Sequence, residues 1–184
     1  MELRAFRSLI ALLALAALAG HSRPASAGDE TGRAASAREK PGLDLRAVRQ
    51  RAMSMPVDAR VDMDKRIAAT VERVNRRASE QGQSAVAARL AAEFSVPGEA
   101  LLDVKGTHGW SWGDVMIAYT LLANTPQGVG PPDLASLRSE GLGWAAIAYG
   151  LQFRMEDFEE AVKAQGRVAM GWSKADGKAE TIGK

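Results

Sequence analysis

The chain has 184 residues, no cysteine, two histidines and a formal net charge of +2. The lack of cysteine excludes disulfide bonds and thiol chemistry, and the shortage of histidine excludes a zinc site built from several His or Cys ligands. The near-neutral charge offers no electrostatic footprint for nucleic acid or for an anionic membrane surface. The composition therefore predicts a domain held by an ordinary apolar core, with no nucleic-acid partner.

The N-terminal segment has the three-part order of a secretory signal peptide. A short positive region is followed by an uncharged apolar run at residues 8–20 (SLIALLALAALAG) and by small residues at 25–27 (ASA). The apolar run is shorter than the roughly 20 residues that a membrane-spanning helix needs. We expect residues 1–27 to be removed by cleavage after Ala27. The mature protein is then expected in the periplasm or secreted, without stable membrane insertion and with equal numbers of basic and acidic residues.

The mature chain divides into three parts by composition. Residues 28–57 are rich in Gly, Ser, Ala and Pro and poor in large apolar side chains, which is typical of a flexible linker. A short helix near residues 43–53 is possible but is not supported by capping residues. A helical domain is expected over residues 58–166, and a flexible tail over residues 167–184.

The helical domain opens with an amphipathic pattern that ends at Gly82. Apolar side chains recur at helical spacing on one face, at Met63, Ile67, Val71, Val74 and Ala78. The other face is basic, with Lys65, Arg66, Arg73, Arg76 and Arg77. Such a face can bind an acidic partner, although it is more often a solvated surface. Arg66, Arg73 and Arg77 are candidate partner contacts.

Two similar segments organise the rest of the domain. Gly109-Trp110-Ser111-Trp112 precedes Ile117-Ala118-Tyr119, and Gly141-Leu142-Gly143-Trp144 precedes Ile147-Ala148-Tyr149. A short helix is expected before each of these glycine-tryptophan segments, with Gly106 and Gly141 at the helix ends. This pattern predicts an all-α fold, a small bundle of about five to six short helices built from degenerate helix-turn-helix-like units.

The second segment resembles the helix-turn-helix of bacterial transcription factors. The helix that would enter the DNA groove begins with four carboxylates, Glu156, Asp157, Glu159 and Glu160. These would repel phosphate, so DNA binding is not expected. Acidic residues in a first helical turn instead favour the helix dipole, and they lack the spacing of a calcium loop.

An enzyme centred on His108 would need a nucleophile such as Ser111 and an orienting acid such as Asp114. Ser111 and Asp114 have the spacing of a helix capping box, which occupies both side chains. We therefore predict no catalytic activity, and no cofactor or metal site.

The aromatic residues offer a different kind of site. Trp112 and Trp144 each begin an amphipathic helix, which is typical of core positions. Trp110 aligns with Leu142 of the second segment, which indicates burial, but its loop is glycine-rich, so it is the best candidate if any of these aromatics is exposed. Tyr149 is a second candidate contact. Exposed tryptophan can stack on sugars or anchor a partner side chain.

Residues 109–121 and 141–151 together resemble uncharacterised exported bacterial proteins with degenerate Gly-Trp-Gly-x-x-x-Ile-Ala helical repeats. The resemblance implies no particular activity. We expect a non-enzymatic protein-interaction module of the bacterial envelope that binds another envelope protein through a groove between units or through the basic face. The alternative is a cell-wall or glycan-binding module that uses an exposed tryptophan.

Overall fold

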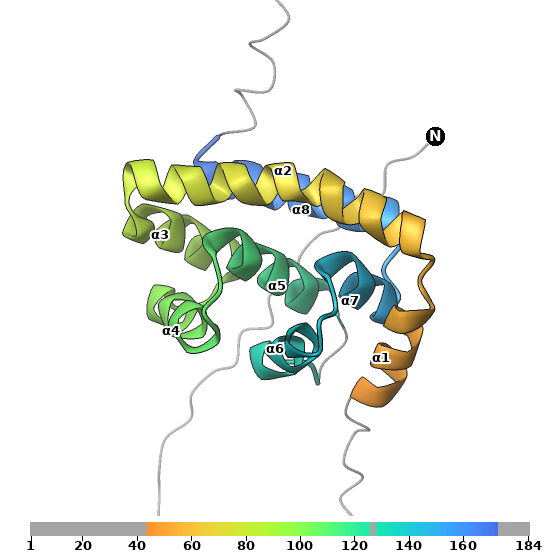
Figure 1. Ribbon diagram of the computed structural model, residues 1–184. Helices are drawn as coiled ribbons and strands as arrows, with labels where there is room; N and C mark the ends of the chain where they lie inside the picture. The colour runs from red at the N-terminus through yellow and green to blue at the C-terminus, as the bar shows by residue number, and fades with distance from the viewer. Residues whose placement is uncertain (1–43, 126–127, 173–184) are drawn as a thin grey trace, which may run out of the picture. The chain divides into compact units, whose positions relative to one another are not determined.

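The structure is a computed structural model that describes residues 44–125 and 128–172. These residues form eight helices, and no strand occurs among them, which confirms the all-α prediction. The helices are α1 (Leu45–Ser54), α2 (Val57–Gln81), α3 (Gln83–Phe94), α4 (Gly98–His108), α5 (Trp112–Asn124), α6 (Pro131–Ser139), α7 (Trp144–Gly150) and α8 (Met155–Met170) (Figure 1). Their number exceeds the five to six expected. None of the described helices combines the length and apolar character that crossing a bilayer requires.

Helix α1 lies inside the range predicted to be a linker, so the helical region begins at Leu45 and not at residue 58. Asp44 caps this helix, since its Oδ1 accepts hydrogen bonds from the backbone N–H groups of Arg46 and Ala47 at 2.9 and 3.3 Å. Val48 and Ala52 are fully buried on the side that packs against α7. The predicted signal peptide and the linker up to residue 43 lie outside the described residues.

Helices α2 and α8 run along each other on one side of the domain (Figure 1). The buried stripe of α2 follows the predicted spacing, except that Thr70 is buried where Val71 is only half-buried. Gly166 of α8 lies directly against the Thr70 side chain, which leaves no room for a Cβ. Helix α8 ends at Met170, beyond the predicted boundary at residue 166, and residues 173–184 of the predicted tail lie outside the described residues.

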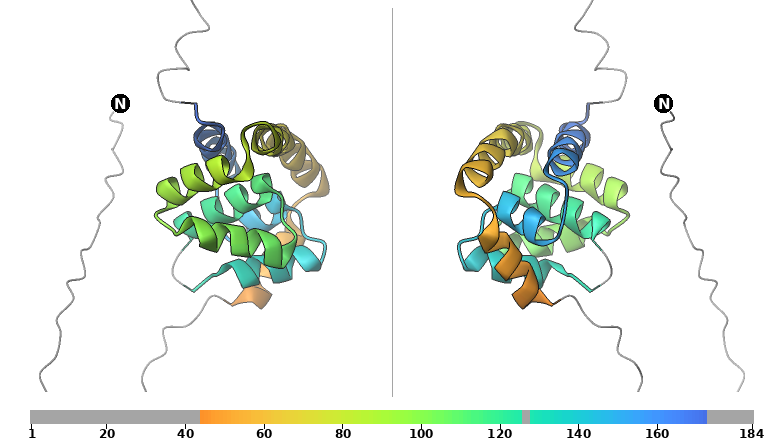
Figure 2. Two further views of the ribbon diagram at one scale, coloured as in Figure 1. Left: turned by 90° about the vertical axis from the view of Figure 1, so that its left-hand side faces the viewer. Right: turned by 90° about the vertical axis from the view of Figure 1, so that its right-hand side faces the viewer.

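Helix α5 is the central element of the core. It contacts α2 and α8 on one side and α4 and α6 on the other, as Figure 2 also shows. Every residue of α5 from Trp112 to Leu121 is buried except Asp114. A helix that is apolar on nearly all of its surface is stable only when other helices cover it, and the surrounding helices do so here.

The two tryptophan-led segments adopt similar local structures. In each, a helix ends near a glycine of positive φ, Gly109 (φ +63°) after α4 and Gly141 (φ +84°) after α6. The next helix then begins at a buried tryptophan, Trp112 or Trp144. Gly141 lies where the sequence predicted a helix end. The prediction for Gly106 is wrong, because α4 continues through it to His108 and Gly109 takes the left-handed capping position.

Candidate functional site

The centre of the candidate site is the contact between α2 and the starts of α5 and α7. Asn75 Oδ1 accepts a hydrogen bond from the Gly113 N–H at 2.8 Å, and Asp64 Oδ1 accepts one from the Ala145 N–H at 3.1 Å. Asp64 and Asn75 are about three helical turns apart on α2, so they lie on the same face. Each therefore satisfies an N–H group in the first turn of a tryptophan-led helix, where the helix itself has no acceptor.

Asp114 joins the two tryptophan-led helices. Its Oδ2 accepts hydrogen bonds from the Ser111 hydroxyl at 2.6 Å and from the Ser111 N–H at 3.0 Å, which completes the predicted capping box. Its Oδ1 accepts the Trp144 indole N–H at 2.7 Å. One carboxylate oxygen therefore caps α5, and the other links α5 to α7.

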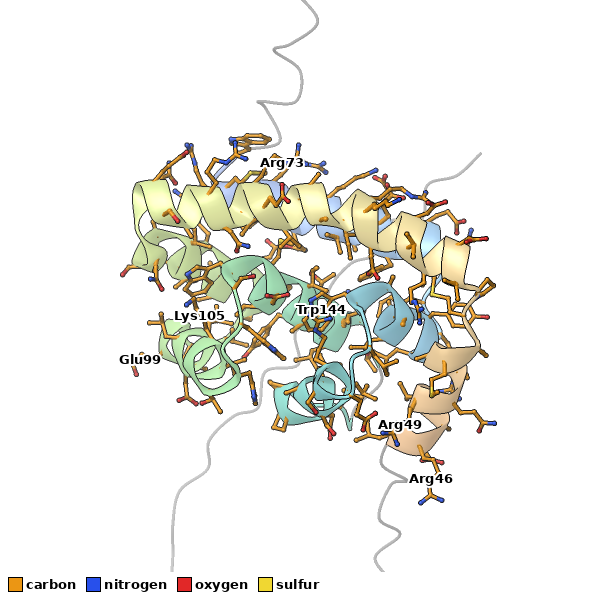
Figure 3. All side chains as sticks on the ribbon, viewed as in Figure 1. Arg46, Arg49, Arg73, Glu99, Lys105 and Trp144 are labelled. Atoms are coloured by element: carbon orange, nitrogen blue, oxygen red, sulfur yellow. The ribbon has the colours of Figure 1, made fainter. Side chains whose placement is uncertain are left out.

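Arg138 of α6 lies over the face of Trp144, with its guanidinium carbon 4.9 Å from the ring centroid. Its Nη1 donates a hydrogen bond to the Leu142 carbonyl at 2.9 Å, which fixes the guanidinium. Figure 3 shows Trp144 close to α5, α6 and α7. Arg138 thus packs on the tryptophan, and the Leu142 carbonyl takes one of the five N–H donors that a guanidinium carries.

Burial raises the pKa of the Asp64 carboxyl above its ordinary value of 3.8. The hydrogen bond from Ala145 and the positive charges of Arg138 and Arg60 act in the opposite direction, favouring the ionised form. Gly143 approaches the same carboxylate closely, since a Cβ built there would lie 2.6 Å from Asp64 Oδ2. The backbone at the start of α7 therefore packs directly against the Asp64 carboxylate.

A hollow of about 540 Å³ has Trp112 in its wall, and a second of about 530 Å³ lies beside Trp110; the two have no lining residue in common. We call the second the unit groove, because it lies between the end of α4 and helix α6, one from each tryptophan-led segment. Its lining residues are His108, Trp110, Pro132, Ala135, Ser136, Arg138 and Ser139. The lining combines hydrogen-bond donors with apolar surface and contains no acidic side chain. This arrangement suits a ligand that carries negative charge beside an apolar group.

Trp110, the best candidate for an exposed aromatic, is buried, in line with its alignment to Leu142. Only 8% of its surface is accessible, because the imidazole of His108 lies 4.9 Å from its ring centroid and Trp144 meets it edge-on at 5.6 Å. It forms a wall of the unit groove and offers no open face for stacking. The core positions predicted for Trp112 and Trp144 are confirmed, with 3% and 5% exposure. Among the described tryptophans only Trp172 is exposed, at 46%.

Tyr149 keeps the exposure that a contact residue needs, at 37%. It lies on α7 and does not line the unit groove, so the structure does not bring it together with Trp110 in one site. These two aromatic candidates are separate features of the surface.

The candidate arginines of α2 are partly engaged within the protein. Arg66 pairs with Glu159 of α8 at 3.2 Å, and Arg77 Nε donates to the Met170 carbonyl at the end of α8 at 3.4 Å. Both therefore help to hold α8 against α2. Arg73 donates to the Thr70 hydroxyl within α2 at 3.2 Å and extends from the outer side of the helix (Figure 3). Of the three, Arg73 remains the most available to a partner.

Three residues that organise this centre were not among the predicted site residues: Asp64, Asn75 and Arg138. Asp64 and Asn75 look like ordinary polar residues of a solvated helix face. The sequence shows that they lie on the same face of α2. It does not show which helix ends pack against that face, and their role depends on this. Among the described residues, no three His, Cys, Asp or Glu side chains are grouped so that they could hold a metal ion.

Comparison with known protein families, with curated proteins and with solved structures finds no match for this chain.

Proposed function

We propose that this protein is a non-enzymatic interaction module, exported to the bacterial envelope, and that the unit groove is where it binds an envelope protein. The observation that carries this proposal is the groove between the two tryptophan-led segments, with Trp110 and Arg138 in its walls. Ser111 and Asp114 support a binding role over a catalytic one, because their hydrogen bonds are used to start α5.

The partner segment should present a carboxylate next to an apolar side chain. The guanidinium of Arg138 is oriented by Trp144 and Leu142, so little entropy is lost when it binds a carboxylate. Trp110, Pro132 and Ala135 supply apolar surface in the same groove. Ser136 and Ser139, both exposed, add hydroxyl groups at its rim.

The site can be tested by photo-cross-linking in cells that express the full chain. A photoreactive residue is placed at Ser136 in the groove, and in a matched strain at Ser54, an exposed serine at the end of α1. We expect a discrete cross-linked envelope protein from position 136 only. Equal cross-linking from both positions, or none from position 136, would contradict the proposal.

The chemistry of the groove is tested with the partner identified in that way. Arg138→Gln should weaken its binding by roughly tenfold or more, the cost of losing one hydrogen-bonded charge pair. Arg154→Gln, which changes an exposed arginine at the start of α8, should leave binding unchanged. Circular dichroism of both variants shows whether the fold is kept.

The export step has its own test. The N-terminus of the protein recovered from the envelope or the medium should be Gly28, read by mass spectrometry. An intact Met1 on the exported protein would exclude cleavage after Ala27.

A glycan-binding role is the second candidate, and the exposed aromatic that favours it is Trp172. Sedimentation with purified peptidoglycan should then fall in Trp172→Ala and remain unchanged in Tyr149→Ala, an exposed aromatic elsewhere on the surface. If the wild-type protein does not sediment, this second candidate is excluded.

A further inference from the structure

The end of α8 gathers arginine side chains from the neighbouring helices. Arg77 of α2 donates a hydrogen bond to the Met170 carbonyl at 3.4 Å. Arg89 of α3 donates one to the Ala169 carbonyl at 3.1 Å. The guanidinium of Arg89 also lies against Gly171, where a Cβ would be 2.8 Å from the Arg89 Cζ. Both arginines are therefore held at the C-terminal end of a helix, where the dipole favours positive charge.

Two further arginines extend this group along α2 and α8. Arg73 lies one turn before Arg77 on the same face of α2, and it extends from the outer side of the helix (Figure 3). Arg167 is exposed in the last turn of α8, and its carbonyl accepts the Trp172 N–H at 2.9 Å. We call Arg73, Arg77, Arg89 and Arg167 the arginine cluster.

Acidic side chains offset only part of the charge of the arginine cluster. Glu80 pairs with Arg77 at 3.6 Å, and both groups are partly exposed, so the pair is weak. Glu93 lies one turn beyond Arg89 on α3 and accepts a hydrogen bond from Gln165 at 3.1 Å. These two carboxylates offset two of the four arginine charges, so a local excess of positive charge remains. The nearly neutral charge of the whole chain therefore does not describe this surface.

Trp172 is the exposed aromatic at the same end of α8. Its bond to the Arg167 carbonyl, together with Gly171 in the left-handed conformation (φ +76°), fixes its backbone at the helix end. Its side chain is accessible, whereas the other three tryptophans of the chain are buried. The chain leaves α8 on the outer side of α2 and α8 (Figures 1 and 2), which is also the side to which Arg73 extends (Figure 3).

The shape and chemistry of this surface indicate the kind of partner. The arginine cluster and Trp172 lie outside the unit groove and the other hollows of about 300–540 Å³. An open surface of this charge fits an extended anionic partner. An anionic phospholipid membrane supplies phosphate groups for the arginines, and its interface favours a tryptophan ring, which is apolar but carries a polar N–H. An acidic protein would supply the charge, but it would need a separate pocket for the ring.

We propose that the arginine cluster and Trp172 bind the surface of an anionic phospholipid membrane, with headgroup phosphates at the arginines and the Trp172 ring in the interface. The association is peripheral and reversible, because a few basic residues and one ring bind far more weakly than an inserted helix does. It uses no residue of the unit groove, so either proposal can fail without the other. It competes with the glycan role for the same aromatic residue.

Vesicle sedimentation tests the proposal directly. Residues 28–184 are used, because the apolar run at residues 8–20 would itself bind lipid; the compact unit of residues 38–184 contains every described helix. We expect binding to vesicles of equal parts phosphatidylglycerol and phosphatidylcholine, and little binding to phosphatidylcholine alone. Raising sodium chloride from about 0.05 M to about 0.5 M should weaken binding, because salt screens exposed charges. Equal binding to both kinds of vesicle, or binding to neither, overturns the proposal.

Trp172 gives its own optical signal, because the other three tryptophans are already buried. Its emission should shift to the blue when vesicles with phosphatidylglycerol are added. Trp172→Ala should remove this shift and weaken binding by roughly tenfold. Tyr149→Ala, which removes an exposed aromatic of α7, should bind as the wild type does. The proposal is overturned if Trp172→Ala binds vesicles as tightly as the wild type, or if it loses only the sedimentation with peptidoglycan.

Two double variants of equal net charge test the arginine cluster. Arg73 and Arg167 are exposed, and changing both to Gln should weaken binding by roughly 25-fold, because each arginine near an anionic surface contributes about fivefold. The control changes Arg46 and Arg154 to Gln, two exposed arginines at the starts of α1 and α8. Figure 3 shows Arg46 far from Arg73. The control should bind as the wild type does, and circular dichroism checks both folds. Equal losses in the two double variants would mean that only the overall charge matters, which overturns the proposal.

Discussion

The starts of α5 and α7 resemble each other in sequence but are stabilised differently. Helix α5 carries its own capping box, Ser111 with Asp114, and Asn75 only adds one hydrogen bond from α2. Helix α7 follows Gly143, an N-cap residue without a side chain, and receives its side-chain acceptor from Asp64 of α2. The start of α5 is therefore stabilised mainly by neighbouring residues in the chain, and the start of α7 by a residue of another helix. The same local pattern can thus be held by two different mechanisms in one domain.

The largest expected effect is a difference in stability between variants of Trp144 and Trp112. Trp144→Phe should lower the free energy of unfolding by about 3 kcal/mol, because it loses core volume and also leaves the Asp114 carboxylate without its indole donor. Trp112→Phe should cost about half as much, because the indole N–H of Trp112 has no partner among the described residues. Urea denaturation of both variants provides the comparison. Equal losses would mean that the Trp144–Asp114 bond contributes little.

The next comparison is steric and concerns Gly113 in the first turn of α5. A Cβ at this position would lie 2.6 Å from Val71 Cγ1 and 2.9 Å from Val71 Cα, so α2 and α5 would have to separate. Gly113→Ala should cost about 2 kcal/mol even though alanine favours helix. Gly106→Ala in α4, where nothing lies within 4 Å, is the matched control and should stabilise by about 0.5–1 kcal/mol. Thermal unfolding measures the change in stability of both variants. If the two changes have the same sign, the close packing of Gly113 against Val71 is contradicted.

The contributions of the two α2 side chains should also differ. Asp64→Ala should be less stable than Asp64→Asn by about 1 kcal/mol, because asparagine can still accept the Ala145 N–H and alanine cannot. Asn75→Ala should cost less, because Ser111 and Asp114 still cap α5. Chemical denaturation at pH 7 tests the order. A larger loss of unfolding free energy in Asn75→Ala than in Asp64→Ala would show that the start of α5 is not stabilised mainly by its own capping box.

The smallest effect is a pH dependence specific to the start of α7. Because burial raises the pKa of Asp64 in the folded state, the folded protein binds the Asp64 proton more tightly than the unfolded chain does. Relative to Asp64→Asn, the wild type should therefore lose stability as pH rises through the window between the ordinary and the raised pKa, and change no further above it. The difference in unfolding free energy between the two proteins, followed from about pH 4 to pH 7, measures this. A difference that grows in favour of the wild type over that range has the opposite sign and would contradict the assignment.

The buried stripe of α2, the capping box at Ser111 and the core positions of Trp112 and Trp144 were readable from the sequence. Each depends on residues close together in the chain, where helical periodicity or cap chemistry acts directly. The start of α1 was equally local, since Asp44 caps it, but the segment around it is rich in Gly, Ser, Ala and Pro and was therefore predicted to be a linker. For Trp110 the sequence left both burial and exposure open, because the outcome depends on His108 and Trp144 packing against it.

The sequence by itself determined that the described part of this protein is all-helical, where most helices lie, and which faces are apolar. Those properties follow from short-range spacing and from the polarity of each side chain. Only the tertiary structure decided that Asp64 caps α7, that Arg66 and Arg77 hold α8, and that the Trp112 indole N–H faces no protein acceptor among the described residues. Those facts depend on which helix ends meet, and helix ends far apart in the chain are brought together by the packing of the whole core.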